Sequence, residues 1–290
     1  KRIIVSDVER SNTYYIAMKK IALYALCCFG ILLSCSKDSD ITSAGSNTNL
    51  KAGNLLTTGA SARDLLSNDN FDNLLIEIAY VAGFEPTFEA ISNFEEFLLA
   101  RTYKENVEFK FTSLSSPSEE TLTLEEVVDL EEENRTQYND GNTMAVYIYF
   151  ADAPTESDQG DENLVTLGAV YRNTSMVIYQ STVEDIANRS SSVSIADVET
   201  ATLLHEFGHL FGLVNLSTQS VNEHEETIIN DDGNEEGNNH CNVDGCLMRS
   251  ELEFGASLLK QMEKNTSKGL ASIPDFDSEC LLDLQKYGGR

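Results

Sequence analysis

The sequence predicts an α+β domain built on a mixed, twisted sheet, with one long helix lying beneath it. Two observations support this fold class: strand-like and helix-like segments alternate along residues 71–290, and a long segment with a helix-capping signal follows the last two strands. The chain is long enough for one domain of moderate size, and it contains no internal repeat. We therefore expect a single folded domain over residues 71–290.

The segments ahead of the long helix show clear periodicity. Apolar runs and alternation predict strands, and apolar residues at helical spacing predict helices. The strand at Thr166–Tyr171 is expected at the edge of the sheet, and residues 172–175 form a tight connection to the next strand. The predicted strands are Leu74–Val81, Val107–Leu114, Met144–Phe150, Thr166–Tyr171 and Met176–Ser181, and the predicted helices are Phe88–Tyr103 and Leu124–Tyr138.

The long helix is predicted to begin at Ile195 and to end at Gly212. Its start is marked by Ser194, whose hydroxyl can cap the helix, and by Asp197, whose carboxylate follows three residues later. Because this segment also contains an H-E-x-x-H motif at residues 205–209, it is the most informative part of the chain.

The H-E-x-x-H motif predicts a metal site. A spacing of four residues returns His205 and His209 to the same helix face, where both imidazoles can bind one ion. Glu206 can then take a proton from a water whose pKa a zinc ion has lowered to about 7. A chance match is the alternative, but the apolar helix around the motif would then bury these three polar side chains without partners.

The motif extends into a family resemblance. The stretch from His205 to Gly212 resembles the longer metzincin motif, although Asn215 stands where that motif has its third histidine. The stretch from His240 to Met248 resembles the archaemetzincin pattern, in which the third histidine is followed by Cys-x4-Cys-x-Met. The resemblance implies that residues 216–239 are an insertion, that His240 is the third ligand and that Met248 forms the Met-turn. His224 and Asn215 remain the alternative ligands.

This resemblance carries expectations about fold and activity. It implies a zincin/metzincin-like fold, a catalytic Zn²⁺ and hydrolysis of peptide bonds, with Glu206 as general base and then general acid. The enzyme would be an endopeptidase or an aminopeptidase acting on a peptide or protein substrate, and the edge strand could bind an extended peptide. The alternative is a metal-binding lipoprotein that keeps the fold but has little or no activity.

The cysteines near the C-terminus leave two alternatives open. In archaemetzincins a second, structural zinc is held by four cysteines, and the corresponding positions here are Cys241, Cys246, Cys280 and Asp283. The chain could therefore hold a second Zn²⁺ with three thiolates and one carboxylate. A disulfide between Cys280 and either Cys241 or Cys246 is the other interpretation.

The N-terminal part predicts export and lipid attachment. Residues 1–34 comprise upstream residues and a signal peptide, and Leu32-Leu33-Ser34-Cys35 resembles a lipobox with Cys35 as the lipidated residue. Residues 35–70 are rich in small polar residues and are expected to form a flexible tether. We thus expect a protein anchored to the outer membrane, on its periplasmic side or at the cell surface. A formal net charge of −28 argues against nucleic acid as a partner.

Overall fold

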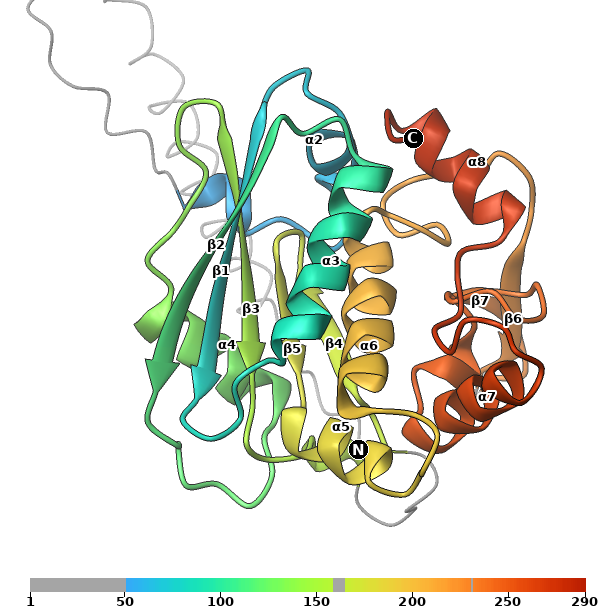
Figure 1. The fold of residues 1–290 in the computed structure, drawn as a ribbon. Coiled ribbons are helices and arrows are strands. Elements are labelled where there is room, and N and C mark those ends of the chain that lie inside the picture. The colour runs from blue at the N-terminus through green and yellow to red at the C-terminus, as the bar shows by residue number, and fades with distance from the viewer. Residues whose placement is uncertain (1–50, 159–164, 231) are drawn as a thin grey trace, which may run out of the picture. The chain divides into compact units, whose positions relative to one another are not determined.

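The computed structural model describes residues 51–158, 165–230 and 232–290 (Figure 1). The expected signal peptide, Cys35 and the first part of the expected tether lie outside these residues. Among the residues that are described, no helix is both long and apolar enough to span a membrane.

The sheet has five strands in the order β2-β1-β3-β5-β4. Neighbouring strands pair in parallel except for β4, which runs antiparallel to β5 at one edge. The fold is therefore mixed α/β with a mostly parallel sheet. The strand predicted at Thr166–Tyr171 corresponds to β4 and lies at the edge of the sheet, as expected. The strands are β1 (Asn73–Val81), β2 (Asn106–Leu114), β3 (Thr143–Phe150), β4 (Gly168–Arg172) and β5 (Ser175–Ile178).

Helices cover both faces of this sheet. Alternate residues of β1 and β3 pack with the apolar sides of the two helices α3 and α6, and the residues between them pack with α4 on the opposite face. A hairpin and two further helices follow α6 (Figure 1). The bounds are α3 (Phe88–Arg101), α4 (Leu124–Asn134), α5 (Gln180–Ala187), α6 (Ile195–Leu210), β6 (Glu225–Ile229), β7 (Glu235–Cys241), α7 (Gly255–Ser267) and α8 (Ser278–Lys286), with short 3₁₀ turns η2 (Glu156–Asp158) and η3 (Ser250–Leu252).

Several predicted element ends were wrong, three of which illustrate the causes. The helix at Leu124 ends at Asn134 rather than at Tyr138, because Arg135 adopts an extended conformation. The strand expected to reach Ser181 ends at Ile178, and α5 takes up the residues from Gln180 onwards. The long helix begins at Ile195 with the predicted capping box, but it ends at Leu210.

The expected tether was wrong for residues 51–70, which form part of the fold. This segment contains a 3₁₀ turn, η1 (Ala52–Asn54), and a short helix, α2 (Ala62–Leu66). Leu65 and Leu66 are fully buried, and the Asn54 side chain donates to the carbonyl of Ala145 in β3 at 2.9 Å. A polar composition hid these contacts, since the amides bond to the sheet instead of to water.

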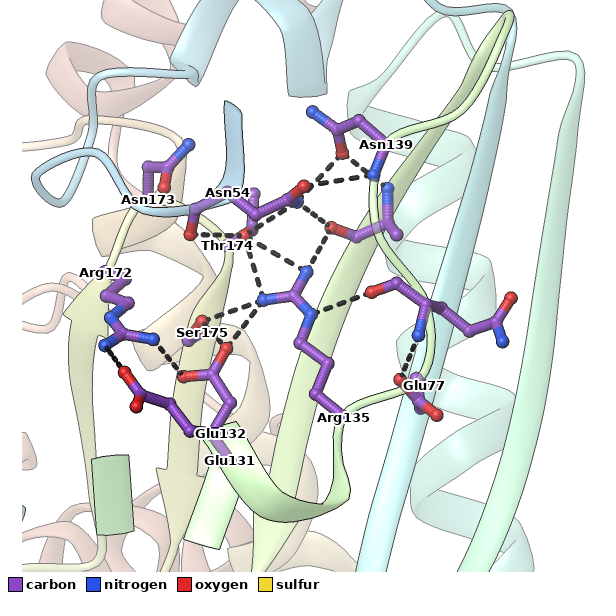
Figure 2. Close-up of polar contacts among 12 residues, drawn as sticks. Asn54, Glu77, Glu131, Glu132, Arg135, Asn139, Arg172, Asn173, Thr174 and Ser175 are labelled. Atoms are coloured by element: carbon purple, nitrogen blue, oxygen red, sulfur yellow. Dashed lines mark hydrogen bonds and ion pairs between the residues drawn. The ribbon is translucent and has the colours of Figure 1, made fainter. Parts of the chain in front are cut away.

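A buried polar network ties this segment and α4 to the sheet (Figure 2). At its centre the guanidinium of Arg135 lies 2.7 Å from a carboxylate oxygen of Glu131 and donates to the carbonyl of Ala145 at 3.0 Å. Ser175 donates to the same carboxylate at 2.7 Å, and Thr174 lies within 3.3 Å of the guanidinium. Every part of this ion pair is thus matched by a hydrogen-bonding partner, as a buried pair requires.

A second buried carboxylate connects α6 to the start of α3. Glu199 is completely buried and accepts the backbone N–H of Thr87 at 2.9 Å. Burial raises the pKa of Glu199 to about 7, while the hydrogen bonds from Thr87 act in the opposite direction. The folded protein therefore binds this proton more tightly than the unfolded chain does, so stability from Glu199 falls as the pH rises from about 4.3 to about 7.

We expect the Glu199→Gln variant to lack this loss of stability, because its amide stays neutral. The stability of the variant relative to wild type should rise by on the order of 3 kcal/mol between about pH 5 and about pH 8, as measured by urea unfolding. The exposed Glu89 on α3 provides the control, since Glu89→Gln should show no such change. A stability difference between Glu199→Gln and wild type that does not vary with pH would contradict the raised pKa of Glu199.

Candidate metal centre

Helix α6 and strand β7 bring three histidines together. His205 and His209 lie one turn apart on α6, and His240 is the penultimate residue of β7. One ring nitrogen from each lies within 4.8 Å of the others, and the ring centroids are 5.0 to 5.4 Å apart. All three residues are buried, with exposed fractions of 2%, 7% and 8%. Three imidazoles are thus gathered around one point.

Hydrogen bonds orient two of these rings. His205 Nδ1 lies 2.8 Å from the carbonyl of Leu247, and His240 Nδ1 lies 2.7 Å from the carbonyl of Asn238. Because a carbonyl only accepts, each Nδ1 carries the proton, and each Nε2 is left with a lone pair. Both Nε2 atoms are buried without a hydrogen-bond partner among the described residues, as is Nδ1 of His209. The two Nε2 atoms without partners fit a metal ion, which would supply the missing partner.

Burial sets the protonation of the centre. It lowers the pKa of His205 to about 4, with a smaller contribution from His240, and it lowers the pKa of His209 well below its usual value. His205 and His209 are therefore in the neutral form that binds metals. Burial also raises the pKa of Glu206, with a further contribution from the nearby Glu253 carboxylate. A cation bound to the histidines would counteract that shift.

The centre opens into a small pocket beside the edge strand. Glu206 lies against Gly168 of β4, where a side chain at position 168 would collide with its carboxylate. On the other side of α6, the sulfur of Met248 lies against Gly208. The pocket has a volume of about 210 Å³ and is lined by Thr58, Ala169, Val170, Glu206, His209, Leu216, Asn238, Asn239, His240 and Glu253.

A second cluster lies on the opposite side of β7. Since neighbouring residues of a strand point to opposite faces, His240 faces the three-histidine centre while Cys241 faces away from it. Ligand atoms of His224, Cys241, Asp277 and Cys280 lie within 4.8 Å of one another, and all but Asp277 are buried. The hairpin forms this group, because its register pairs Glu225 with Cys241 and so places His224 beside that thiol.

Cys246 completes this cluster. Its sulfur lies 3.6 Å from that of Cys280 and is approached by the backbone N–H groups of Met248 and Asp277 at 3.4 and 3.5 Å. The hydrogen bond from the Cys241 thiol, followed in size of effect by that from the Cys280 thiol, lowers the pKa of Cys246 well below its usual value. Cys246 and Cys280 thus lie side by side, and the His224 ring approaches the third thiol, Cys241.

The ring of His224 is held by a carboxylate outside the cluster. His224 Nδ1 is 3.4 Å from the sulfur of Cys241, and its Nε2 is 2.9 Å from an oxygen of Asp283. The hydrogen bond to Asp283 raises the pKa of His224, and burial opposes that effect. A carboxylate that orients the ring and leaves the other nitrogen facing the thiols is the usual arrangement around a metal-binding histidine.

Several predictions about ligands need correction. Asp283 is outside the second group and bonds to His224 instead of lying among the thiols, and the three cysteines are unbridged in this structure. His224, expected in a solvated loop, is only 2% exposed. Asn215 does not reach the histidine centre, since its amide donates to Glu225. Asp277 was missed, although its position as the N-cap of α8, three residues before Cys280, is visible in the sequence.

The fold and the two clusters define a mixed α/β protein with a buried three-histidine centre and an adjacent thiol-rich centre. No protein-family model matches the chain, and no curated protein matches it. Among solved structures, the chain is similar to the crystal structure of archaemetzincin from Methanopyrus kandleri. The two share 15% sequence identity over 76% of this chain and 96% of the other, with a TM-score of 0.43.

Proposed function

We propose that this protein is a zinc-dependent peptidase whose active site is the three-histidine centre. The observation that carries the proposal is the close group of three buried histidines, His205, His209 and His240, next to a carboxylate that opens into the same pocket. Nε2 of His205 and of His240 has no hydrogen-bond partner among the described residues. Three neutral imidazoles would leave one position of a tetrahedral zinc ion free, as catalytic sites require. Zinc bound there would polarise the substrate carbonyl and lower the pKa of a water molecule.

Glu206 has the position for both proton transfers. It neighbours His205 on α6, it lines the pocket with His209 and His240, and Gly168 leaves room for its carboxylate. In the proposed reaction it takes the proton from the attacking water and then gives it to the leaving amine. No other carboxylate on α6 faces this pocket.

Strand β4 is the proposed peptide-binding edge. In the described part of the chain it pairs with β5 alone, so its other edge is free to bond to an extended substrate. Ala169 and Val170 of this strand line the pocket with Glu206. An added peptide strand would therefore run past the metal centre.

We further propose that the second cluster holds a structural zinc. Its donors are Cys241, Cys246, Cys280 and Nδ1 of His224, which gives a closed set of four and leaves no position for a substrate. Asp277 also has a carboxylate oxygen within 4.8 Å of the His224, Cys241 and Cys280 ligand atoms, and its side chain accepts the N–H of Cys280 at the start of α8. We assign it the role of capping the helix that presents the thiol.

The proposal is tested by metal content and hydrolysis measured on the same purified protein. We expect two zinc ions per chain in wild type, one in His205→Ala and in His240→Ala, and two in Asn215→Ala, by elemental analysis. Glu206→Gln should keep both ions while its turnover of a peptide library falls by about 10²- to 10⁴-fold. Full metal content in His205→Ala would refute the centre, and zinc binding without hydrolysis in wild type would leave a metal-binding protein with no peptidase activity.

A further inference from the structure

Glu253 is a carboxylate at the metal centre that the proposed reaction does not use. It follows the 3₁₀ turn η3, and its N–H bonds to the carbonyl of Ser250 at 3.2 Å. The next residue, Phe254, forms a bridge with Thr166, and the N–H of Gly255 donates to the carbonyl of Val165 at 3.0 Å. The backbone on both sides of Glu253 is therefore fixed, and one side is fixed against the segment that leads into β4.

This carboxylate stands at the junction of two pockets. It lines the small pocket that contains Glu206 and His240, and it also lines an adjoining pocket of about 660 Å³. The second pocket shares Ala169 of β4 with the first and extends past Thr166 to Tyr179, the residue that follows β5. A substrate lying along β4 with its scissile bond at the metal centre would place a neighbouring group in this second pocket.

The two pockets have a one-sided charge. Among the described residues, their lining contains the carboxylates of Glu156, Glu206 and Glu253 but no lysine or arginine. The other polar groups include the hydroxyls of Thr155, Thr166 and Tyr179. Such a wall attracts cations and repels anions. No basic side chain of the described lining pairs with these carboxylates.

Glu253 accepts no hydrogen bond from the metal-binding nitrogen of His240. In the structure its Oε2 lies 3.3 Å from Nε2 of His240, the nitrogen that would bind zinc. A zinc-bound Nε2 carries no proton, so it cannot donate to Glu253. The Glu253 side chain is 30% exposed, and among the described residues it lies outside the group of three histidine nitrogens. It is therefore placed at the rim of the centre, facing the substrate.

We propose that Glu253 binds a cationic group of the substrate next to the scissile bond, so that the enzyme selects positively charged peptides. The group is either a free α-amino terminus or a lysine or arginine side chain. This inference rests on the proposed peptidase function.

The test separates binding from turnover by using the zinc-loaded Glu206→Gln protein, which holds peptide without cleaving it. Three peptides of equal length are titrated by calorimetry. The first has an acetylated amino terminus and one lysine, the second has a free amino terminus and uncharged side chains, and the third has an acetylated amino terminus and uncharged side chains. We expect one of the first two to bind about tenfold or more tightly than the third, which also identifies the source of the charge. Adding Glu253→Gln should remove the preference.

Glu251→Gln is the matched control, because Glu251 is half exposed, lies in the same 3₁₀ turn and pairs with Arg249 instead of facing the pocket. It should leave the preference unchanged. Equal binding of the three peptides, no peptide binding at all, or a preference that survives Glu253→Gln would overturn the inference. A tenfold loss of zinc affinity in Glu253→Gln, measured by chelator competition, would also overturn it, because Glu253 would then be a metal ligand. Absence of zinc from wild type would instead refute the proposed function itself.

Discussion

The Cys280→Ser variant is expected to lose one zinc ion and a large part of the stability of the fold. Cys280 is fully buried and connects α8 to the loop that carries Cys241 and Cys246. Structural zinc sites contribute apparent binding free energies of about 10–16 kcal/mol at neutral pH, and much of that energy stabilises the fold. We therefore expect one zinc per chain by elemental analysis and a fall in Tm of more than about 10 °C by calorimetry. Ser278→Ala, an exposed position in the same helix, is the control.

The same variant should also weaken the histidine centre. The N–H of Cys241 bonds to the carbonyl of Met248 at 2.7 Å and closes a loop that holds Cys246. His240 precedes this loop, and the carbonyl of Leu247 within it orients His205. Loss of a group that orients a metal ligand typically lowers metal affinity by about 10- to 100-fold. The affinity for the remaining zinc, measured by chelator competition, should therefore fall by about 10- to 100-fold. Unchanged affinity and stability after loss of the second zinc would contradict a structural role.

Local signals explain which parts of the centre the sequence could predict. The start of α6 depends on Ser194 and Asp197, and the pairing of His205 with His209 depends only on helix geometry. These interactions span a few residues, so periodicity and capping rules reveal them. The resemblance to the archaemetzincin pattern also predicted that His240 lies beside the helix pair, although it follows His209 by 31 positions in the sequence.

The remaining site residues depend on contacts that have no local pattern. His224 is surrounded by glutamates in the sequence, and only the register of β6 with β7 turns it toward Cys241. Glu253 belongs to a short 3₁₀ region, and it reaches the centre because Phe254 bridges to Thr166. Asn54 is one of many polar residues near the N-terminus, yet it is completely buried. In each case the position results from tertiary structure that overrides composition.

Loss of Arg135 is expected to destabilise the opposite face of the sheet more than any other single change there. The side chains of Arg135 and Glu131 are 0% and 1% exposed, and the guanidinium also donates to the carbonyls of Gln137 and Ala145. Arg135→Met removes the cation and leaves the Glu131 carboxylate buried, with Arg172 at 3.2 Å as its remaining cationic partner. Breaking a buried ion pair in this way costs about 3–5 kcal/mol. Urea unfolding measures the loss.

Two comparisons separate the ion pair from general damage to the fold. Lys110 lies 3.6 Å from Glu77 and is 42% exposed, so Lys110→Met should cost less than about 1 kcal/mol. The double variant Glu131→Leu with Arg135→Met should be more stable than Arg135→Met alone, because it leaves no unpaired carboxylate. Zinc content should stay at the wild-type value in all three, since the network packs on the α4 side of the sheet and the histidines lie on the α6 side. A cost for Arg135→Met no larger than that for Lys110→Met would show that the buried network does not hold α4 and the N-terminal segment on the sheet.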